Sequence, residues 1–530
     1  PALIFHGLED TALHSDALNN TWDWSRKDVT IASVPGRGHF VQQDAPALVS
    51  QTMRWWLWSR YERLHFFVGN NGSGEGNVLS EQIADQTRFS PAYRNYALGI
   101  LFVGYIVNFV DRSILAILLE PIKAELILSD TELGMLGGLA FALFYATLGI
   151  PIAALADRTS RVRILAISMI IWSAMTALCG AASNFVTLLL ARVGVGVGEA
   201  GASPPSHSLI SDYFPLEGRA TALSIYALGI PIGSMVGNFV GGWGADELGW
   251  RNTFYLVGFP GIVIALFIWA TLREPPRGMS DIGVNQTKEN TAAPSIKETF
   301  NFLWKKRAFK HIALAAGLHS FVSYGAGTWN PPFMSRVHEM SNTDIGQWLA
   351  IVAGTGAIGT FLGGYLADRF SDKTGDRRWY FWLPGISTLL MVPIQIYTYL
   401  YASIIGVIIN LIILASLGAI YLGPSFAMTQ ALVTIRMRAV ASAILLFTLN
   451  IIGMGLGPFL IGVFSDLIEP VVNNNAVSLQ YALCIAVFGN LWATVHYFIG
   501  ARHVENDLKD TEEFNATLNS GDESIRTTSK

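Results

Sequence analysis

Charged residues are scarce in this chain. Only 14% of its 530 residues are charged, whereas 51% are hydrophobic. A soluble globular domain carries about a quarter charged residues, so the composition excludes an ordinary soluble fold and indicates a membrane protein. The net charge of −4 and the lack of a basic patch give no support to nucleic acid as a partner.

Cysteine is almost absent as well. Cys179 and Cys484 each lie inside an apolar run, and we expect two buried thiols without a shared role. The 10 histidines are scattered without metal-ligand spacing, and no Gly-x-x-x-x-Gly-Lys run is present for an ATP site. The sequence therefore predicts neither a metal centre nor a cofactor.

The start of the chain lacks a signal peptide. It opens on Pro1 with a polar mixture, and we expect the true start to lie upstream. Two strand patterns, Ala2–His6 and Val29–Val34, and a helix pattern, Ala45–Trp58, predict a soluble N-terminal piece. The glycine-rich stretch Asn70–Asn77 reads as a flexible linker.

Long apolar runs fill the chain beyond this piece, and about twelve of them reach the length of a membrane span. They begin near Tyr96, Thr131, Val162, Phe185, Ala220, Thr253, Ile312, Asp344, Tyr380, Ile404, Val440 and Leu479. We predict an all-α membrane protein. Its parts are a linker at 61–92, six-helix bundles at 93–273 and 311–501, a cytoplasmic loop at 274–310 and a disordered tail at 502–530.

One motif occurs in both predicted bundles. Ala153–Arg161 reads AALADRTSR, and Gly364–Ser371 reads GYLADRFS. Each copy ends an apolar run with an acid–base pair. A duplicated membrane unit with the same charged hinge predicts a transporter built from two related bundles. We expect structural gating, rather than substrate contact, from Asp157, Arg158, Arg161, Asp368 and Arg369.

The basic residues predict the orientation in the membrane. One set of loops holds Arg158, Arg161, Arg163, Arg219, Arg369, Lys373, Arg377, Arg378, Arg436 and Arg438. The other set holds only Lys123, Arg251 and Arg336. Because positively charged loops stay in the cytoplasm, both termini are predicted to be cytoplasmic.

Charged side chains inside the spans are the main candidates for function, since each costs several kcal/mol unless it is paired or hydrated. Asp111 and Arg112 lie in the first span, and Arg192 and Glu199 lie in the fourth. Arg192 and Glu199 are close to two helical turns apart, so they share one face. Two interpretations stay open: a carboxylate that takes up a proton beside an arginine that holds an anionic substrate, or salt bridges that lock the two spans together.

Polar side chains in the later spans are weaker candidates. They are His319, Tyr324, Trp329 and Asn330 in the seventh span and Asn450 in the eleventh. Each could line a central cavity. Each stands alone, however, and a hydrogen-bonded packing residue is the alternative interpretation.

These patterns together resemble the major facilitator superfamily over about Tyr93 to Arg502. The paired Gly-x-Leu-Ala-Asp-Arg motif is specific for that family, although Ala153 replaces the usual glycine in the first copy, and Trp250–Phe254 is also typical. The resemblance implies twelve helices in two pseudo-symmetric bundles.

Within the superfamily, the chain is most similar to the Spinster-like branch. The residues that carry this similarity are Asp111-Arg112, the Arg192–Glu199 segment and Ser208–Pro215. The branch implies lysolipid or sphingolipid-type substrates and proton-linked transport, with Asp111, Arg112, Arg192 and Glu199 at its charged core positions. Organic-anion symporters share the Asp-Arg and Gly-Glu-Ala motifs, which keeps an organic anion open as the substrate.

The N-terminal piece resembles the last part of an α/β-hydrolase of the epoxide-hydrolase type. On this resemblance residues 1–60 are a remnant in which Asp10 is the triad acid and His39 the base. The nucleophile of that fold would precede Pro1, and an acid and a base alone cannot run covalent hydrolysis. We therefore expect no enzyme activity.

The sequence favours a secondary transporter that moves an amphipathic or anionic organic molecule by alternating access with protons. We expect a monomer in the bacterial inner membrane whose partners are a small organic or lipid-like substrate, protons and the bilayer.

A hydrolase fused to a transporter, or two neighbouring genes read as one, would account for the N-terminal piece. A receptor is disfavoured by charges in both bundles, and a channel would need a lined pore without alternating gates.

Overall fold

The computed structural model describes residues 2–7, 29–34, 89–280 and 295–520. The chain divides into two units, residues 1–88 and 89–530. In the first unit, β1 (Ala2–Gly7) and β2 (Val29–Val34) pair in parallel, with Ala2 opposite Val29. These are the two strands that the sequence predicts. Asp10, His39 and the helix pattern at 45–58 lie outside the described residues.

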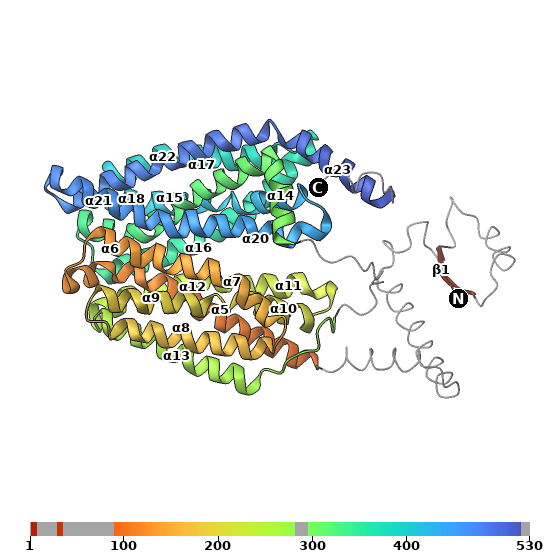
Figure 1. Ribbon diagram of the computed structural model, residues 1–530, viewed down its shortest axis with the longest axis horizontal. Helices are drawn as coiled ribbons and strands as arrows, with labels where there is room; N and C mark the ends of the chain where they lie inside the picture. Colours follow the sequence, from red (N-terminus) through yellow and green to blue (C-terminus); the bar gives the residue numbers. More distant parts are fainter. Residues whose placement is uncertain (1, 8–28, 35–88, 281–294, 521–530) are drawn as a thin grey trace. The chain divides into compact units, whose positions relative to one another are not determined.

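The second unit is a bundle of long helices (Figure 1). Its first six segments are α5 (Pro91–Leu126); α6 (Asp130–Gly134), π-helical η2 (Met135–Leu139) and α7 (Ala140–Ala156); α8 (Arg161–Gly180); α9 (Phe185–Glu199) with α10 (Ser203–Tyr213); α11 (Leu216–Ala227) with α12 (Gly229–Glu247); and α13 (Trp250–Thr271). The next six are α15 (Arg307–His338); α16 (Asn342–Thr374); α17 (Trp379–Leu400); α18 (Ile404–Ala419) with α19 (Leu422–Ala431); η3 (Ile435–Met437), α20 (Arg438–Thr448), π-helical η4 (Leu449–Leu456) and α21 (Gly457–Val472); and α22 (Asn475–Ala501).

Eleven of these segments are long and apolar enough to cross a membrane, judged by length and composition in the described residues. The remaining one, α15, is 32 residues long and packs inside the same bundle, against α22 and α21. It is less apolar because it carries polar groups such as His319, Ser320 and Asn330 along its length. The prediction of an all-α membrane fold is confirmed.

Capping side chains determine where several helices begin. The first helix begins at Pro91, before the predicted Tyr96, because the Ser90 hydroxyl accepts the Tyr93 N–H and proline fits the first turn. Ser295 and Glu298 form a reciprocal capping box that starts α14 (Ile296–Lys305). This short helix lies within the predicted cytoplasmic loop at 274–310.

The predicted disordered tail is wrong for α23 (Val504–Ser520), which is helical. The Asp507 carboxylate accepts the Ala308 N–H at 2.6 Å, and the Thr511 hydroxyl donates to the Leu432 carbonyl at 3.2 Å. Leu508 is buried against the same surface. These tertiary contacts stabilise a helix that the polar composition alone would not support.

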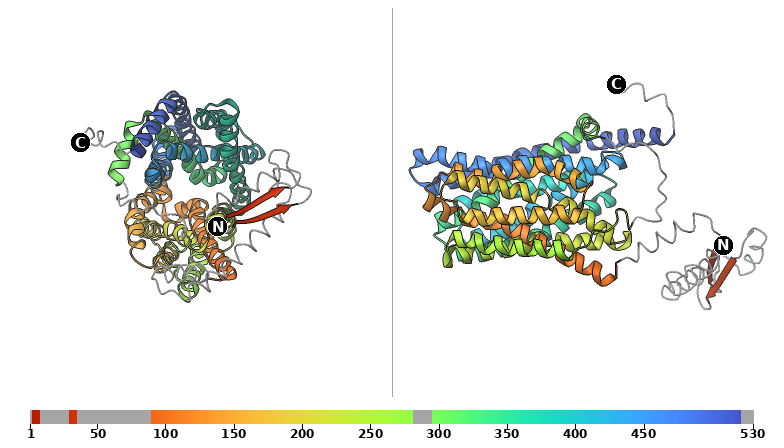
Figure 2. Two further views of the ribbon diagram at one scale, coloured as in Figure 1. Left: turned by 90° about the vertical axis from the view of Figure 1, so that its right-hand side faces the viewer. Right: turned by 60° about the horizontal axis from the view of Figure 1, so that its bottom comes forward.

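The two halves meet along two main seams, α12 against α16, and α6, η2 and α7 against η4 and α21, and α5 also packs against α15. Figure 2 shows the two halves side by side in the view along the helices, the first half in orange to yellow-green and the second in green to blue. Glycines bring the backbones together at both seams. A Cβ added to Gly346 would lie 2.9 Å from the Gly242 Cα, and one added to Gly138 would lie 2.7 Å from the Met454 carbonyl oxygen.

The bundle has two distinct ends. We call the one that carries Arg158, Arg369, Arg378 and α23 the basic end. The other, with the turns after α5, α15 and α21, is called the opposite end (Figure 1).

Close packing within the first half predicts which glycines tolerate a side chain. A Cβ on Gly258 of α13 would lie 2.7 Å from both the Ser173 carbonyl oxygen and the Ala177 nitrogen of α8, whereas one on Gly99 meets nothing within 4 Å. We expect Gly258→Val to destabilise the purified protein by about 1–3 kcal/mol, seen as a lower Tm in detergent. Gly99→Val is the matched control, and equal Tm values for the two variants would contradict this packing.

Candidate functional site

A buried ion pair joins the first helix to the fourth segment. The Arg112 Nε donates to Glu199 Oε2 at 2.6 Å, and the Glu199 side chain is fully buried while Arg112 is 18% exposed. Arg112 lies in the middle of α5, and Glu199 is the last residue of α9. The structure therefore brings two of the four predicted charged residues into direct contact, deep within the spans.

Aromatic rings surround the Arg112 guanidinium. Its central carbon lies 5.0 Å from the Phe109 ring centre, 5.1 Å from Phe141 and 4.6 Å from Tyr145. Arg192, the second predicted arginine, lies 5.5 Å from the same Phe141 ring. Cation–π attraction of this kind strengthens where water is excluded, so the rings help to hold both arginines in an apolar environment.

Asp111 is fully buried beside this pair on the side of α8. Neither of its carboxylate oxygens has a hydrogen-bond partner among the described residues, and the same holds for Nε and Nη1 of Arg192. The polar side chains nearest to Asp111 include Glu199, Arg192, Thr176 and Trp172. A buried carboxylate without a fixed donor is costly when it is ionised, which makes Asp111 unusual among the described residues.

Tyr324 of the second half lies close to the cluster. The Tyr324 side chain of α15 is 42% exposed and lies near enough to Arg112 and Tyr145 to interact electrostatically with both. Of the five predicted cavity-lining residues, Tyr324 is the one that the structure brings toward Arg112.

The other predicted cavity-lining residues of the second half are packed between helices, and most of them are hydrogen-bonded. The His319 Nε2 donates to the Gly418 carbonyl at 2.9 Å, which leaves Nδ1 to accept the Thr388 hydroxyl at 3.0 Å. His319 thus ties α15 to α17 and α18. The Trp329 indole donates to the Pro458 carbonyl at 2.8 Å.

Asn330 and Asn450 complete the predicted set. The Asn330 side-chain oxygen accepts the Tyr399 hydroxyl at 3.3 Å. Asn450 is buried in the π-helical segment η4, which packs against η2 and α7 of the first half.

In the first copy of the repeated motif, Arg161 forms a buried network of ion pairs and hydrogen bonds at the basic end. Arg161 is buried and pairs with Asp212 of α10 and, at 2.7 Å, with Glu274 after α13. Burial would raise the pKa of Glu274, but hydrogen bonds from the Val162 N–H, Arg161 and Ser160 outweigh it and hold the pKa below its usual value. All of these contacts lie within the first half.

The other motif residues lie at the surface. Asp157 is exposed, 3.9 Å from Arg277, and Arg158 is exposed beside it. In the second copy, Asp368 accepts the Tyr380 hydroxyl at 2.6 Å and Arg369 donates to the Tyr365 hydroxyl at 2.6 Å. In this conformation the two copies organise their own halves.

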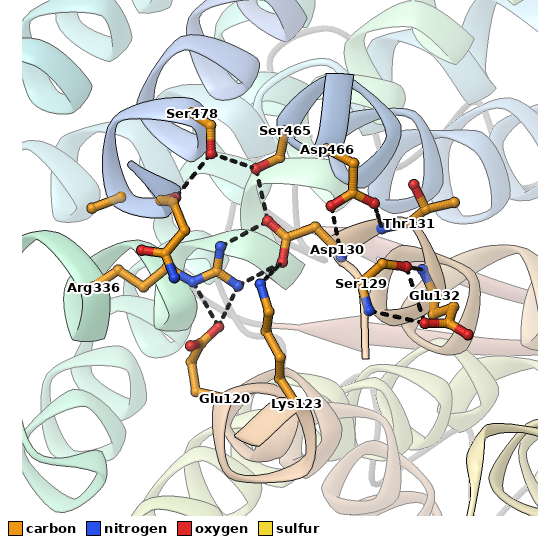
Figure 3. A network of polar contacts seen from close by, with 12 residues as sticks. Glu120, Lys123, Ser129, Asp130, Thr131, Glu132, Arg336, Ser465, Asp466 and Ser478 are labelled. Carbon is orange, nitrogen blue, oxygen red and sulfur yellow. Dashed lines mark hydrogen bonds and ion pairs between the residues drawn. The ribbon is translucent and has the colours of Figure 1, made fainter. Parts of the chain in front are cut away.

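A second charged network joins the two halves at the opposite end (Figure 3). Arg336 of α15 donates to Glu120 of α5 at 2.6 Å and to both carboxylate oxygens of Asp130 at 2.7 Å. Lys123 also donates to Asp130 at 2.6 Å. Asp130 is fully buried and Arg336 is 4% exposed, so the network is largely shielded from solvent. We call it the Arg336 lock.

Helix α21 closes the lock from the other side. The Asp466 carboxylate accepts the backbone N–H groups of Asp130 at 3.0 Å and Thr131 at 2.7 Å, and the Ser465 hydroxyl donates to Asp130 at 2.7 Å. A carboxylate at the first turn of α6 also complements the positive end of that helix. The lock therefore holds α6 of the first half against α15 and α21 of the second.

Another polar contact between the halves lies at the same end. The Asp246 carboxylate accepts the Asn342 amide at 2.7 Å and the Thr343 N–H at 2.7 Å and hydroxyl at 2.8 Å. The lock and this contact both lie at the opposite end, which is thereby closed by polar bonds between the halves.

The Arg336 lock is not among the sequence predictions. In the sequence, Arg336 and Lys123 enter only as basic residues of the less basic loops, and Glu120, Asp130 and Asp466 have no predicted role. A signal was present, because these charges lie within or at the ends of predicted spans, where an unpaired charge is costly. The pairing depends on the crossing of α5, α15 and α21, which the sequence does not specify.

Comparisons with known proteins agree with this architecture. Residues 101–458 match the family model of the Major Facilitator Superfamily. The chain is 31% identical over 428 residues to an MFS-type efflux pump of Mycolicibacterium smegmatis, covering 80% of this chain and 96% of that protein. The chain belongs to the major facilitator superfamily and is a multi-pass membrane transporter.

The branch follows from two further relatives. A crystal structure of a bacterial homolog to the human lysosomal transporter Spinster, inward-facing and unoccupied, matches with a TM-score of 0.73 at 34% identity, over 79% of this chain and 99% of that one. The sphingosine-1-phosphate transporter SPNS2 of Danio rerio is 27% identical, covering 74% of this chain and 81% of that protein. The chain is a Spinster-like member of the superfamily.

The Arg336 lock predicts a shift in conformation on mutation. Arg336→Ala leaves Lys123 as the one cation paired with the buried Asp130 among the described residues, and breaking a buried pair costs about 3–5 kcal/mol. We expect the opposite end to open more often. A Ser478→Cys reporter, buried beside Ser465, should then react at least several-fold faster with a soluble maleimide.

Arg251→Ala is the matched control for this experiment. Arg251 pairs with Glu125 at 2.8 Å at the same end, but both residues are partly exposed and belong to the first half. Cys179 and Cys484 are replaced by alanine in every variant. If Arg336→Ala labels no faster than Arg251→Ala, the lock does not hold the halves together.

Proposed function

We propose that this chain is a proton-coupled secondary transporter that moves an amphipathic, anionic organic molecule by alternating access. Glu199 and Asp111 carry the protons, and Arg112 binds the anionic group of the substrate. Arg192 balances the charge of the two carboxylates. The observation that carries the proposal is the buried Arg112–Glu199 pair, enclosed by aromatic rings and partly exposed only on its arginine side.

Competition for Arg112 supplies the coupling. An ionised Glu199 occupies the guanidinium at 2.6 Å. When Glu199 takes up a proton it loses its charge, and Arg112 is released to bind an anion from the substrate. Proton uptake and anion binding therefore favour each other, and the affinity for the substrate rises as pH falls.

The surroundings of Arg112 favour an amphipathic substrate. Phe109, Phe141 and Tyr145 offer apolar faces next to the cation, and Tyr324 adds one from the second half. An acyl or sphingoid chain would pack against such rings while its acidic head reaches the arginine. The name of the SPNS2 relative, a sphingosine-1-phosphate transporter, is consistent with this class.

Alternating access requires a closed end and an open one. The Arg336 lock and the Asp246 contacts close the opposite end. With the basic end in the cytoplasm, as the basic loops predict, this conformation faces inward. We propose a monomer in the bacterial inner membrane with both termini in the cytoplasm.

Transport by two neutral variants tests the proton sites. In liposomes with an imposed pH gradient, Glu199→Gln and Asp111→Asn should each abolish uptake driven by that gradient, because neither amide can release a proton. The matched control is Glu247→Gln, an exposed glutamate at the end of α12, which should transport normally. If both site variants transport like the original protein, the assignment of the proton sites is wrong.

A thermal-shift screen tests the substrate class. We expect lysophospholipids or sphingoid phosphates to raise the Tm of the purified protein by several degrees, more strongly at acidic pH. Arg112→Gln should remove the shift, whereas Arg251→Gln, another arginine paired with a glutamate, should retain it. If short hydrophilic organic anions stabilise the protein equally well, the substrate resembles that of the organic-anion symporters instead.

A further inference from the structure

Helix α14 presents apolar side chains outward. Ile296, Phe300 and Trp304 are 51%, 41% and 55% exposed, and their spacing of four residues places them on one stripe. The neighbouring stripe, Thr299 and Leu303, is buried against the bundle. The helix thus has two apolar stripes, of which the second-half core covers only one.

The exposed stripe is an ordered aromatic surface. Phe300 and Trp304 stack with ring centres 5.3 Å apart and an angle of 18° between their planes. The Lys310 ammonium lies 5.7 Å above the Trp304 ring. An indole beside a lysine is typical of the interface between hydrocarbon and lipid headgroups.

Free basic charge surrounds this stripe. Lys297, Lys305, Arg307 and Lys310 are all exposed, and none has a carboxylate partner among the described residues. The negative groups nearby are already engaged. Glu298 caps the helix start, and Lys306 points inward to Asp510 at 3.6 Å and to the Asp507 carbonyl at 3.1 Å.

The helix lies across the ends of the spanning helices instead of along them. Figures 1 and 2 show it at the edge of the bundle at the basic end, next to α20. Helix α14 thus lies at the margin of the bundle, at the level of the helix ends. A helix in this position, with one apolar face and a basic border, matches the properties of helices that lie in the membrane interface.

We propose that α14 is an interfacial anchor that binds anionic phospholipid in the inner leaflet. Ile296, Phe300 and Trp304 insert among the upper acyl chains, and Lys297, Lys305, Arg307 and Lys310 contact lipid phosphates. This role goes beyond transport chemistry and rests only on the cytoplasmic position of the basic end.

The proposed anchor packs against other elements of the second half. Helix α14 contacts α20 and the start of α15, and Phe302 packs on Phe514 of α23 with ring centres 5.3 Å apart. Helix α20 continues into η4 and α21, which carry Ser465 and Asp466 of the Arg336 lock. Helix α14 thus packs against α20, whose chain continues into the segment that carries Ser465 and Asp466.

Depth measurements with spin labels test the proposal. Single cysteines replace Ile296, Phe300, Trp304, Asn301 and Lys305 in the protein without Cys179 and Cys484, and the labelled proteins are placed in phosphatidylcholine nanodiscs containing phosphatidylglycerol. We expect labels at 296, 300 and 304 to collide with oxygen and be shielded from a soluble nickel chelate. Labels at 301 and 305 should show the reverse. Equal nickel accessibility at all five positions, as for a helix in water or under a partner protein, would overturn the proposal.

The lipid charge is tested separately, so that a disturbed stack at Phe300 or Trp304 does not decide the result. The label at 296 is compared in pure phosphatidylcholine and in the anionic mixture, with and without the K297Q/K305Q/R307Q/K310Q changes. The anionic lipid should deepen the label only when the basic residues are present. A depth independent of both variables would contradict headgroup binding. Neither experiment depends on transport, so failure here and failure of the proton-site assignment are distinguishable.

Discussion

The whole arrangement depends on the requirement that charge in a hydrocarbon environment be paired. Arg112 and Glu199 satisfy it with a direct ion pair, and Arg192 and Asp111 lie next to them with polar atoms that no side chain fixes. The first pair is a direct ion pair, whereas the second leaves polar atoms without a partner among the described residues. The proposed coupling rests on this contrast.

The Arg336 lock also pairs buried charge, but it does so at the opposite end and between the two halves. There the fully buried Asp130 receives three donors, from Arg336, Lys123 and Ser465, and Glu120 completes the arginine's pairing. Because these donors come from both halves, opening this end must break the network and hydrate its charges. The Arg112 cluster lies within the first half and faces Tyr324 of the second. In the mechanism that we propose, the Arg112 cluster couples proton and substrate, and the Arg336 lock closes the opposite end.

Much of the fold could be predicted from the sequence because the bilayer restricts the alternatives. Long apolar runs must be helices, and the repeated Leu-Ala-Asp-Arg motif indicates the two related halves. Tertiary contacts decided the rest. Helix α23 forms because Asp507 and Thr511 find backbone partners on other helices, and its polar sequence gave no sign of them. Helix α14 carries an alternation of apolar and basic residues that is short enough to be hidden within a polar loop.

The sequence predicts which residues form the candidate site, but not which of them pair with one another. Asp111, Arg112, Arg192 and Glu199 stand out because each is a charge inside an apolar run. That Arg112 pairs with Glu199, and that Phe141 contacts both arginines, follows from the crossing of α5, α7 and α9. His319 shows the opposite case. It is equally conspicuous in the sequence, yet Gly418 and Thr388 satisfy both of its ring nitrogens.

The central claim is that the substrate anion and the Glu199 carboxylate compete for one guanidinium. Its most direct test is the titration of purified protein with an anionic lysolipid at acidic and at alkaline pH, with and without Glu199→Gln. The competition predicts that binding to the original protein weakens as pH rises, while the glutamine variant binds equally well at both pH values. A glutamine variant that keeps the original pH dependence would contradict it.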